Sequence, residues 1–125
     1  MSTLTLDAEG SIALDRGDRR LLVLLARAAA LGERITVPTT ALAHAIRRPS
    51  TQVRLSRLIR QPNTGVAALS ALDATAVSIL LATSKTSDIV DAHVVICARR
   101  LRGSIVTSDP DDRRRLDPDA ALIAV

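Results

Sequence analysis

The chain has 125 residues, 47% of them hydrophobic, one cysteine and a formal net charge of +4. This length suffices for one hydrophobic core, so we expect a single domain over residues 1–125. Phe, Tyr and Trp are absent, which excludes nucleic-acid binding by base stacking on aromatic platforms. The lone Cys97 excludes an internal disulfide, and the absence of a signal-peptide pattern or membrane-span pattern predicts a cytoplasmic protein that does not enter a membrane.

The spacing of apolar residues predicts alternating strands and helices. Short apolar runs bounded by turn residues are expected to be strands, at residues 3–6, 34–38, 66–72, 104–108 and 120–125. Longer runs with helical spacing are expected to be helices, at residues 19–31, 39–48, 51–60, 74–84, 88–102 and 110–116. Such alternation predicts a three-layer α/β/α sandwich with a small, mainly parallel five-stranded sheet.

Turn and capping residues set the expected ends of these elements. Gly10 is expected to turn the chain after the first strand. The expected N-caps are Asp18, Ser50 and Asp73, with Thr86 or Ser87 before the helix from residue 88 and Pro110 as a first helical residue. The expected helix stops are Gly32, Pro49 and Gly103.

An arginine-rich interval lies between Glu33 and Asp73 and contains no acidic residue. Its members are Arg34, Arg47, Arg48, Arg54, Arg57 and Arg60. Arginine holds phosphates in bidentate fashion, so the interval is suited to a nucleic-acid backbone. The same pattern is also that of a solvated helix face, and both interpretations stay open.

Four aspartates follow predicted strands or begin predicted helices: Asp7, Asp88, Asp91 and Asp109. The carboxyl ends of parallel strands meet at one edge of the sheet, so these carboxylates can share one cleft. Clustered carboxylates are the ligands that Mg²⁺ or Mn²⁺ prefers, and such ions promote phosphodiester hydrolysis. Asp7 is the strongest candidate, because an acid at the end of a central strand is costly to bury without a cation.

Helix capping is the competing explanation for the other three acids. Asp88 and Asp91 both fall in the first turn of one helix, where the positive end of the helix stabilises a carboxylate. Capping accounts comfortably for one of them and less well for two. Asp109 precedes Pro110 in a pattern typical of an N-cap, so taken alone it is structural.

Four stretches resemble PIN-domain nucleases, and especially the VapC-type toxins of bacterial toxin–antitoxin pairs. They are LTLDAEGSIAL, VPTTALAHAIRR, TSDIVDAHVVICARR and SIVTSDPDDRRRL, and they occur in the family's order. The corresponding family pattern for the last stretch is xVVTSDPDDLRRL. The resemblance covers nearly the whole chain and implies the PIN-like form of the predicted sandwich.

The family's acidic residues carry over unevenly. The first, third and fourth family acids match Asp7, Asp91 and Asp109, and Asp88 matches a frequent additional acid. The second family acid, usually Glu, falls at His44, and a neutral imidazole suits Mg²⁺ less well than a carboxylate. Glu9 stands where the family has a small residue, so we consider that Glu9 supplies the missing carboxylate; an exposed loop Glu is the alternative.

The resemblance implies a divalent-metal-dependent endoribonuclease. Asp7, Asp91 and Asp109 would be catalytic and would hold Mg²⁺ or Mn²⁺ with Asp88. The arginines at 47, 48, 54 and 57 would bind RNA, and the partners would be a cognate antitoxin and a second copy in a homodimer. The departure at His44 favours an alternative, a degenerate PIN domain that binds RNA or protein. A phosphoacceptor receiver domain fits less well, since it needs an Asp after the third strand and a late Lys, whereas only Lys85 is present.

Overall fold

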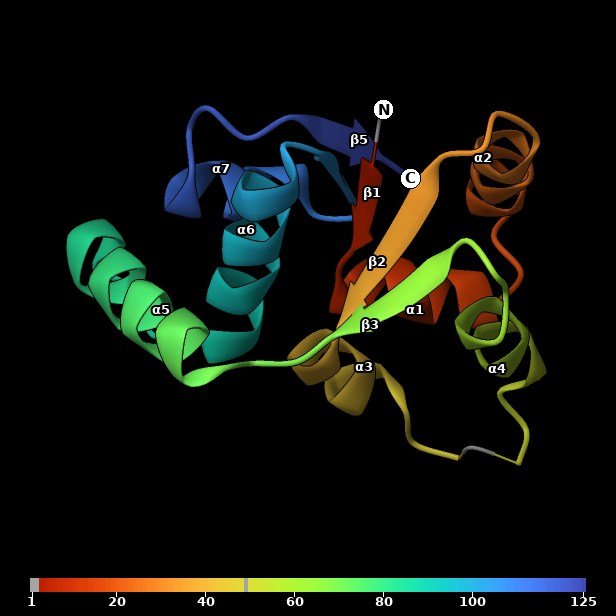
Figure 1. The fold of residues 1–125 in the computed structure, drawn as a ribbon, viewed down its shortest axis with the longest axis horizontal. Helices are drawn as coiled ribbons and strands as arrows, with labels where there is room; N and C mark the ends of the chain where they lie inside the picture. The colour runs from red at the N-terminus through yellow and green to blue at the C-terminus, as the bar shows by residue number, and fades with distance from the viewer. Residues whose placement is uncertain (1–2, 49) are drawn as a thin grey trace.

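Five parallel strands form one sheet in the computed structural model, which describes residues 3–48 and 50–125. The strands are β1 (Thr3–Leu6), β2 (Arg34–Pro38), β3 (Thr64–Ala67), β4 (Ser104–Thr107) and β5 (Leu122–Ala124). The strand order is β3-β2-β1-β4-β5, so β1 is central and pairs with β2 and β4 (Figure 1). The predicted five-stranded parallel sheet is therefore confirmed.

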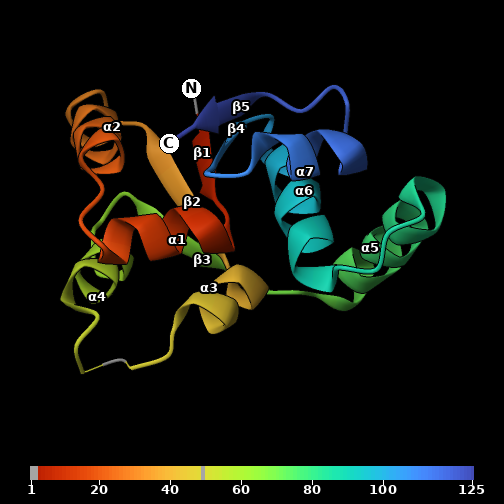
Figure 2. The same cartoon turned by 180° about the vertical axis from the view of Figure 1, so that it is seen from behind.

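Helices cover both faces of the sheet. They are α1 (Ala8–Asp15), α2 (Arg19–Ala30), α3 (Thr39–Ala45), α4 (Val53–Ile59), α5 (Ala71–Ser84), α6 (Ile89–Leu101) and α7 (Pro110–Leu116). Figure 2 shows α1, α2 and α4 on one side of the sheet and α6 and α7 on the other, with α5 outermost against α6. This arrangement is the predicted three-layer α/β/α sandwich. Within the described ranges, no helix is long and apolar enough to cross a membrane.

Two apolar clusters, one on each face, form the core. The first is built from alternate residues of β1 and β2, such as Leu4, Leu6 and Val37, packed against buried residues of α1, α2 and α4. The second joins α6, which is buried from Ala92 to Ala98, to α5, α7 and Ile105 of β4. Helix α6 is thus buried over most of its length and contacts the central strand β1.

The segment after β1 is a helix rather than the expected turn. Asp7 is the N-cap of α1, and Gly10 is buried inside this helix. A side chain at Gly10 would have its Cβ 2.8 Å from Leu6 Cδ1 and 2.9 Å from the Val106 carbonyl oxygen. The glycine is therefore required by close packing of α1 on the sheet and not by a turn.

Several predicted boundaries also shift. β3 ends at Ala67 rather than near residue 72, because Ser70 caps α5 in a reciprocal capping box with Asp73; Asp73 is thus inside the helix and is not its N-cap. Gln52 rather than Ser50 occupies the N-cap position of α4, and Asp88 rather than Thr86 or Ser87 caps α6.

The other predicted elements agree closely with the structure. The Asp18 N-cap, the stop at Gly32 with φ of 70° and the start of α7 at Pro110 are confirmed. Helix α3 ends at Ala45, before the predicted limit at residue 48, and the predicted stop at Pro49 lies outside the described residues.

Candidate functional site

Asp7 is fully buried at the carboxyl end of the central strand. Its side chain is 0% exposed, and its Oδ1 accepts a hydrogen bond of 2.6 Å from the backbone N–H of Gly10. The first turn of α1 thus fixes one carboxylate oxygen, while Oδ2 points to another element. A buried carboxylate needs a cationic partner, and the structure supplies one from the far end of the chain.

That partner is Arg113 of α7. Its Nε donates a hydrogen bond of 2.9 Å to Asp7 Oδ2, and its Nη1 lies 2.8 Å from Oδ1 of Asp91. The Arg113 side chain is 2% exposed, so the guanidinium is buried between the end of β1 and the start of α6. The contact with Asp91 has ion-pair distance without hydrogen-bond alignment, since Nη1 has no hydrogen-bond acceptor.

Burial and charge act against each other in this cluster. Burial raises the pKa of Asp91 above its usual range, and the opposing effect of the Arg113 guanidinium is too small to cancel it. Burial lowers the pKa of Arg113, but the carboxylates of Asp7 and Asp91 more than offset this, so the pKa of Arg113 is raised. Arg113 therefore remains a cation between the Asp7 and Asp91 carboxyl groups.

The two other predicted acids lie at helix starts at the same edge of the sheet. Asp88 accepts from the backbone N–H of Asp91 at 3.0 Å, and Asp109 accepts from that of Asp112 at 3.4 Å. Both side chains are exposed. Among the described residues, no three His, Cys, Asp or Glu side chains are grouped closely enough to hold a metal ion. The structure thus brings Asp7 and Asp91 together through Arg113 and leaves Asp88 and Asp109 capping their own helices.

His44 and Glu9 occupy different surroundings. His44 is exposed on α3. Glu9 is half-buried on α1 and lines a hollow of about 370 Å³ together with Arg16, Asp18 and Ser108. Ser108 directly precedes Asp109, so this hollow adjoins the loop at the carboxyl end of β4.

The predicted phosphate-binding arginines lie on and before α4. Arg47, Arg48, Arg54 and Arg57 are exposed. The side-chain Oε1 of Gln52 accepts hydrogen bonds from the backbone N–H groups of Arg47 and Arg48 at 2.9 and 3.0 Å and so holds these two residues beside α4. The four arginines present charge to solvent, although Arg47 and Arg54 also donate to nearby backbone carbonyl oxygens.

A second polar cluster lies where α5 and α3 pack against α6. Asp73 forms an ion pair with Arg100, and hydrogen bonding by this guanidinium is the main reason why the pKa of Asp73 is lowered to about 2. His93 is fully buried on α6, with its Nδ1 2.6 Å from the hydroxyl of Thr40, and burial lowers its pKa. These contacts join α3, α5 and α6 on the side of the sheet opposite α2.

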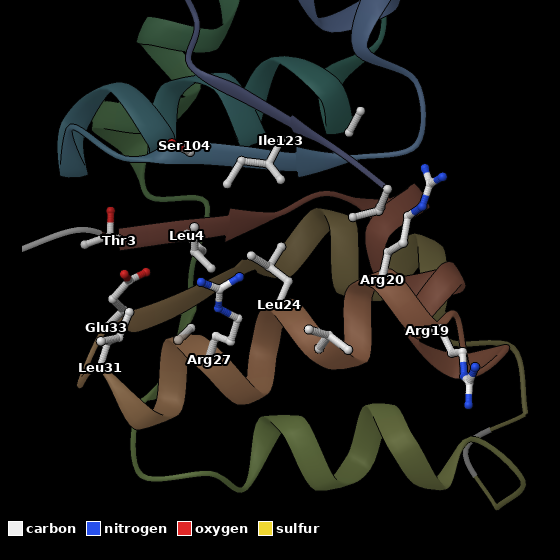
Figure 3. A pocket seen from close by; sticks show the side chains of 14 residues that line it. Thr3, Leu4, Arg19, Arg20, Leu24, Arg27, Leu31, Glu33, Ser104 and Ile123 are labelled. Atoms are coloured by element: carbon white, nitrogen blue, oxygen red, sulfur yellow. The ribbon is translucent and has the colours of Figure 1, made fainter.

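A larger hollow of about 700 Å³ lies between α2 and the face of the sheet formed by β1, β4 and β5 (Figure 3). Leu4, Leu24 and Ile123 point into it, the Arg27 side chain rises from α2 between Leu4 and Leu24, and Glu33 lies at one end. It begins at the start of β1, whereas Asp7 follows the other end of that strand. The hollow is thus separate from the acidic cluster, and the sequence did not indicate it.

Arg113 is the residue of the acidic cluster that the sequence analysis missed. Two features of the sequence could have identified it. It precedes the buried Leu116 by three residues, so both lie on the same side of α7. It also stands where the family pattern quoted above has Leu.

Comparison with known proteins identifies the fold. The sequence matches no protein-family description that was compared with it, and it matches no curated protein. Among solved structures, the chain is similar to a chain in the crystal structure of VapBC2 from Rickettsia felis bound to a DNA fragment from their promoter. The TM-score is 0.70 at 14% sequence identity, and the match covers 98% of each chain. The chain therefore has a VapBC2-like fold, which confirms the PIN-like sandwich.

Proposed function

We propose that this chain is a divalent-metal-dependent endoribonuclease of the PIN type. The observation that carries the proposal is the convergence of Asp7 and Asp91 on one cationic group at the carboxyl edge of the sheet. Ligands of open α/β sheets bind at this edge. Two carboxylates that face a common point there, one of them fully buried, are suited to a cation rather than to an apolar ligand.

The acids at this edge of the sheet are of the type that a hard divalent ion prefers. Asp7 and Asp91 offer carboxylate oxygens, and the Arg113 guanidinium marks the place where positive charge is stabilised. Asp88 and Asp109 lie at the same edge and would complete the ligand set directly or through water. Glu9 is the further candidate for the carboxylate that His44 does not provide. A bound Mg²⁺ or Mn²⁺ would neutralise phosphate charge and orient a water molecule for attack on phosphorus.

Other residues of this chain would orient the Asp7 carboxylate and bind the phosphates of the RNA. The backbone N–H of Gly10 holds the Asp7 carboxylate in one orientation. The exposed arginines on α4 would bind the backbone phosphates of RNA, and Arg54 and Arg57 are the principal candidates because they project from an ordered helix. Without aromatic residues, RNA recognition would rest on phosphates and base edges and not on stacking.

The proposed assembly includes an antitoxin and a second copy of the chain. The similar solved structure is a VapBC2 complex, which supports a partner protein of antitoxin type. For the homodimer, the support is the exposed apolar surface of α5, where Leu72 is 75% and Ile79 is 63% exposed. Large apolar side chains grouped on one surface helix favour burial against another protein.

RNA cleavage tests the proposal. Wild-type protein is incubated with a structured RNA in Mg²⁺ or Mn²⁺, with and without a chelator. We expect metal-dependent cleavage that Asp91→Asn abolishes and Asp111→Asn preserves. The two changes remove the same charge, but Asp111 is 85% exposed and pairs only with Arg114 on the surface. Cleavage that persists in chelator, or equal loss in both variants, would contradict the assignment.

A second candidate function is a degenerate PIN domain that binds RNA or protein without cleaving it. The buried Arg113 already neutralises part of the acidic cluster, and His44 replaces the second family acid. RNA binding that needs no divalent ion, together with no cleavage at any metal concentration, would favour this alternative.

A further inference from the structure

Arg113 occupies the position between Asp7 and Asp91 that a bound cation would need. The same two carboxylates are its contacts, at 2.9 Å for Asp7 and 2.8 Å for Asp91. Each carboxylate oxygen that faces this guanidinium is unavailable to a metal ion while the contact lasts. An ion held by both carboxylates and the Arg113 guanidinium therefore cannot occupy this position at the same time.

Arg113 contacts Asp7 and Asp91 with different geometry, and this difference affects how readily the guanidinium can leave them. Arg113 makes an aligned hydrogen bond to Asp7, but its Nη1 is buried without an aligned acceptor although Asp91 lies within ion-pair distance. A buried guanidinium with an unsatisfied N–H is less stable than a fully hydrogen-bonded one. Asp91 is also partly exposed, at 20%, so solvent and ions reach the cluster from that side.

We propose that Arg113 is a built-in counter-cation that sets the affinity of the acidic cluster for divalent ions. An ion binds only to molecules in which the guanidinium has left Asp7 and Asp91, and its apparent affinity is reduced by the fraction of such molecules. The inference rests on the proposed function only in taking the cluster as a divalent-ion site. It adds that Arg113 limits the occupancy of this site by a divalent ion.

Manganese binding to three proteins tests the inference. Free Mn²⁺ is measured by electron paramagnetic resonance while the ion is titrated into wild type, Arg113→Met and Arg114→Met. Arg113→Met keeps a long apolar side chain and removes the competing charge, so Mn²⁺ affinity should rise by about tenfold or more. Arg114→Met removes the same charge from the next residue of α7, which is 57% exposed, and should leave the affinity within about twofold of wild type.

Thermal unfolding of the same proteins gives a second readout. Without metal, Arg113→Met leaves the Asp7 and Asp91 carboxylates unpaired, so its midpoint should fall well below that of wild type. Mn²⁺ should raise this midpoint much more than that of wild type or Arg114→Met, because the ion then replaces the lost cation. If Arg113→Met is unfolded without metal, Mn²⁺-induced folding supports the inference. Arg113→Lys, which cannot bridge both acids, should then show intermediate Mn²⁺ affinity.

The outcomes separate the inference from the proposed function. Equal Mn²⁺ affinity in wild type and Arg113→Met, or binding in neither, overturns the role of Arg113. If the two affinities are equal but wild type cleaves RNA in a metal-dependent way, the proposed nuclease function is still supported. Tight Mn²⁺ binding by Arg113→Met without RNA cleavage supports the inference and contradicts the nuclease.

Discussion

Replacement of Asp7 by Asn tests the energetic importance of the buried ion pair. The Asp7 side chain is 0% exposed and its partner Arg113 is 2% exposed, so the pair is screened from water on both sides. Asn keeps the size of the side chain but leaves the Arg113 charge with Asp91 alone. Removal of one partner from a buried pair costs about 3–5 kcal/mol, and because Asp91 still pairs with Arg113 we expect a loss toward the lower end of this range.

The expected loss is large relative to the stability of a domain of this size. Typical domains unfold with about 5–15 kcal/mol, so Asp7→Asn should remain folded but lose a substantial part of its stability. The midpoint of thermal unfolding should fall by roughly 10–20 °C. Urea denaturation followed by circular dichroism measures the free-energy change in the absence of metal.

Two control variants test whether the expected loss comes from the buried pair of Asp7 and Arg113. Asp111→Asn breaks a surface pair of 3.2 Å with Arg114 and should cost about 0.5 kcal/mol or less. The double variant Asp7→Asn/Arg113→Met removes both charges, so it should be more stable than Asp7→Asn, with a coupling free energy of about 2 kcal/mol or more. A cost below about 1 kcal/mol for Asp7→Asn, or no coupling with Arg113, would contradict a buried ion pair at this position.

Three further predictions concern other parts of the molecule. Alanine at both Arg54 and Arg57 should weaken binding of unrelated RNAs alike and reduce the salt dependence by about one unit of slope per lost phosphate contact, as measured in filter binding; an unchanged slope would identify these arginines as a solvated surface only. His44→Glu should raise RNA cleavage at limiting Mg²⁺ if the site lacks a carboxylate ligand, whereas unchanged cleavage in a metal titration would count against that deficiency. Because Arg100 holds the pKa of Asp73 at about 2 instead of 3.8, the ion pair contributes to the free energy of unfolding above about pH 4, and this contribution is lost as the pH falls toward 2. The free energy of unfolding of Arg100→Met should therefore fall less steeply over this pH interval than that of wild type. Identical pH profiles would exclude the pair as a source of acid lability.

The fold was predictable because its signals are local. Helix α2 has an N-cap at Asp18 and a stop at Gly32, and the apolar run of β2 ends at a proline. Helix α1 was missed because it is short and contains Gly10, a residue that disfavours helices in isolation. Gly10 is required because a Cβ at this position would crowd Leu6 and the Val106 backbone, and such a contact between distant residues cannot be read from the local sequence.

The candidate site was predictable in part. The positions of Asp7 and Asp91 at the edge of the sheet follow from strand and helix boundaries. The role of Arg113 was missed because it belongs to a run of three arginines, of which Arg114 and Arg115 are exposed. Its spacing from Leu116 distinguishes it from these neighbours, but its pairing with Asp7 and Asp91 depends on how α7 packs. At Asp88 and Asp109, the sequence likewise could not distinguish a helix-capping role from a metal-binding role.

A crystal structure of the protein soaked in Mn²⁺, with the ion located by anomalous scattering, tests directly whether the acidic cluster is a metal site. We expect one anomalous peak at coordination distance from Asp7 and Asp91, with the Arg113 guanidinium displaced from both carboxylates. An anomalous map without a peak at this position, with Arg113 still bridging Asp7 and Asp91 at saturating Mn²⁺, would contradict the assignment of this cluster as a metal site.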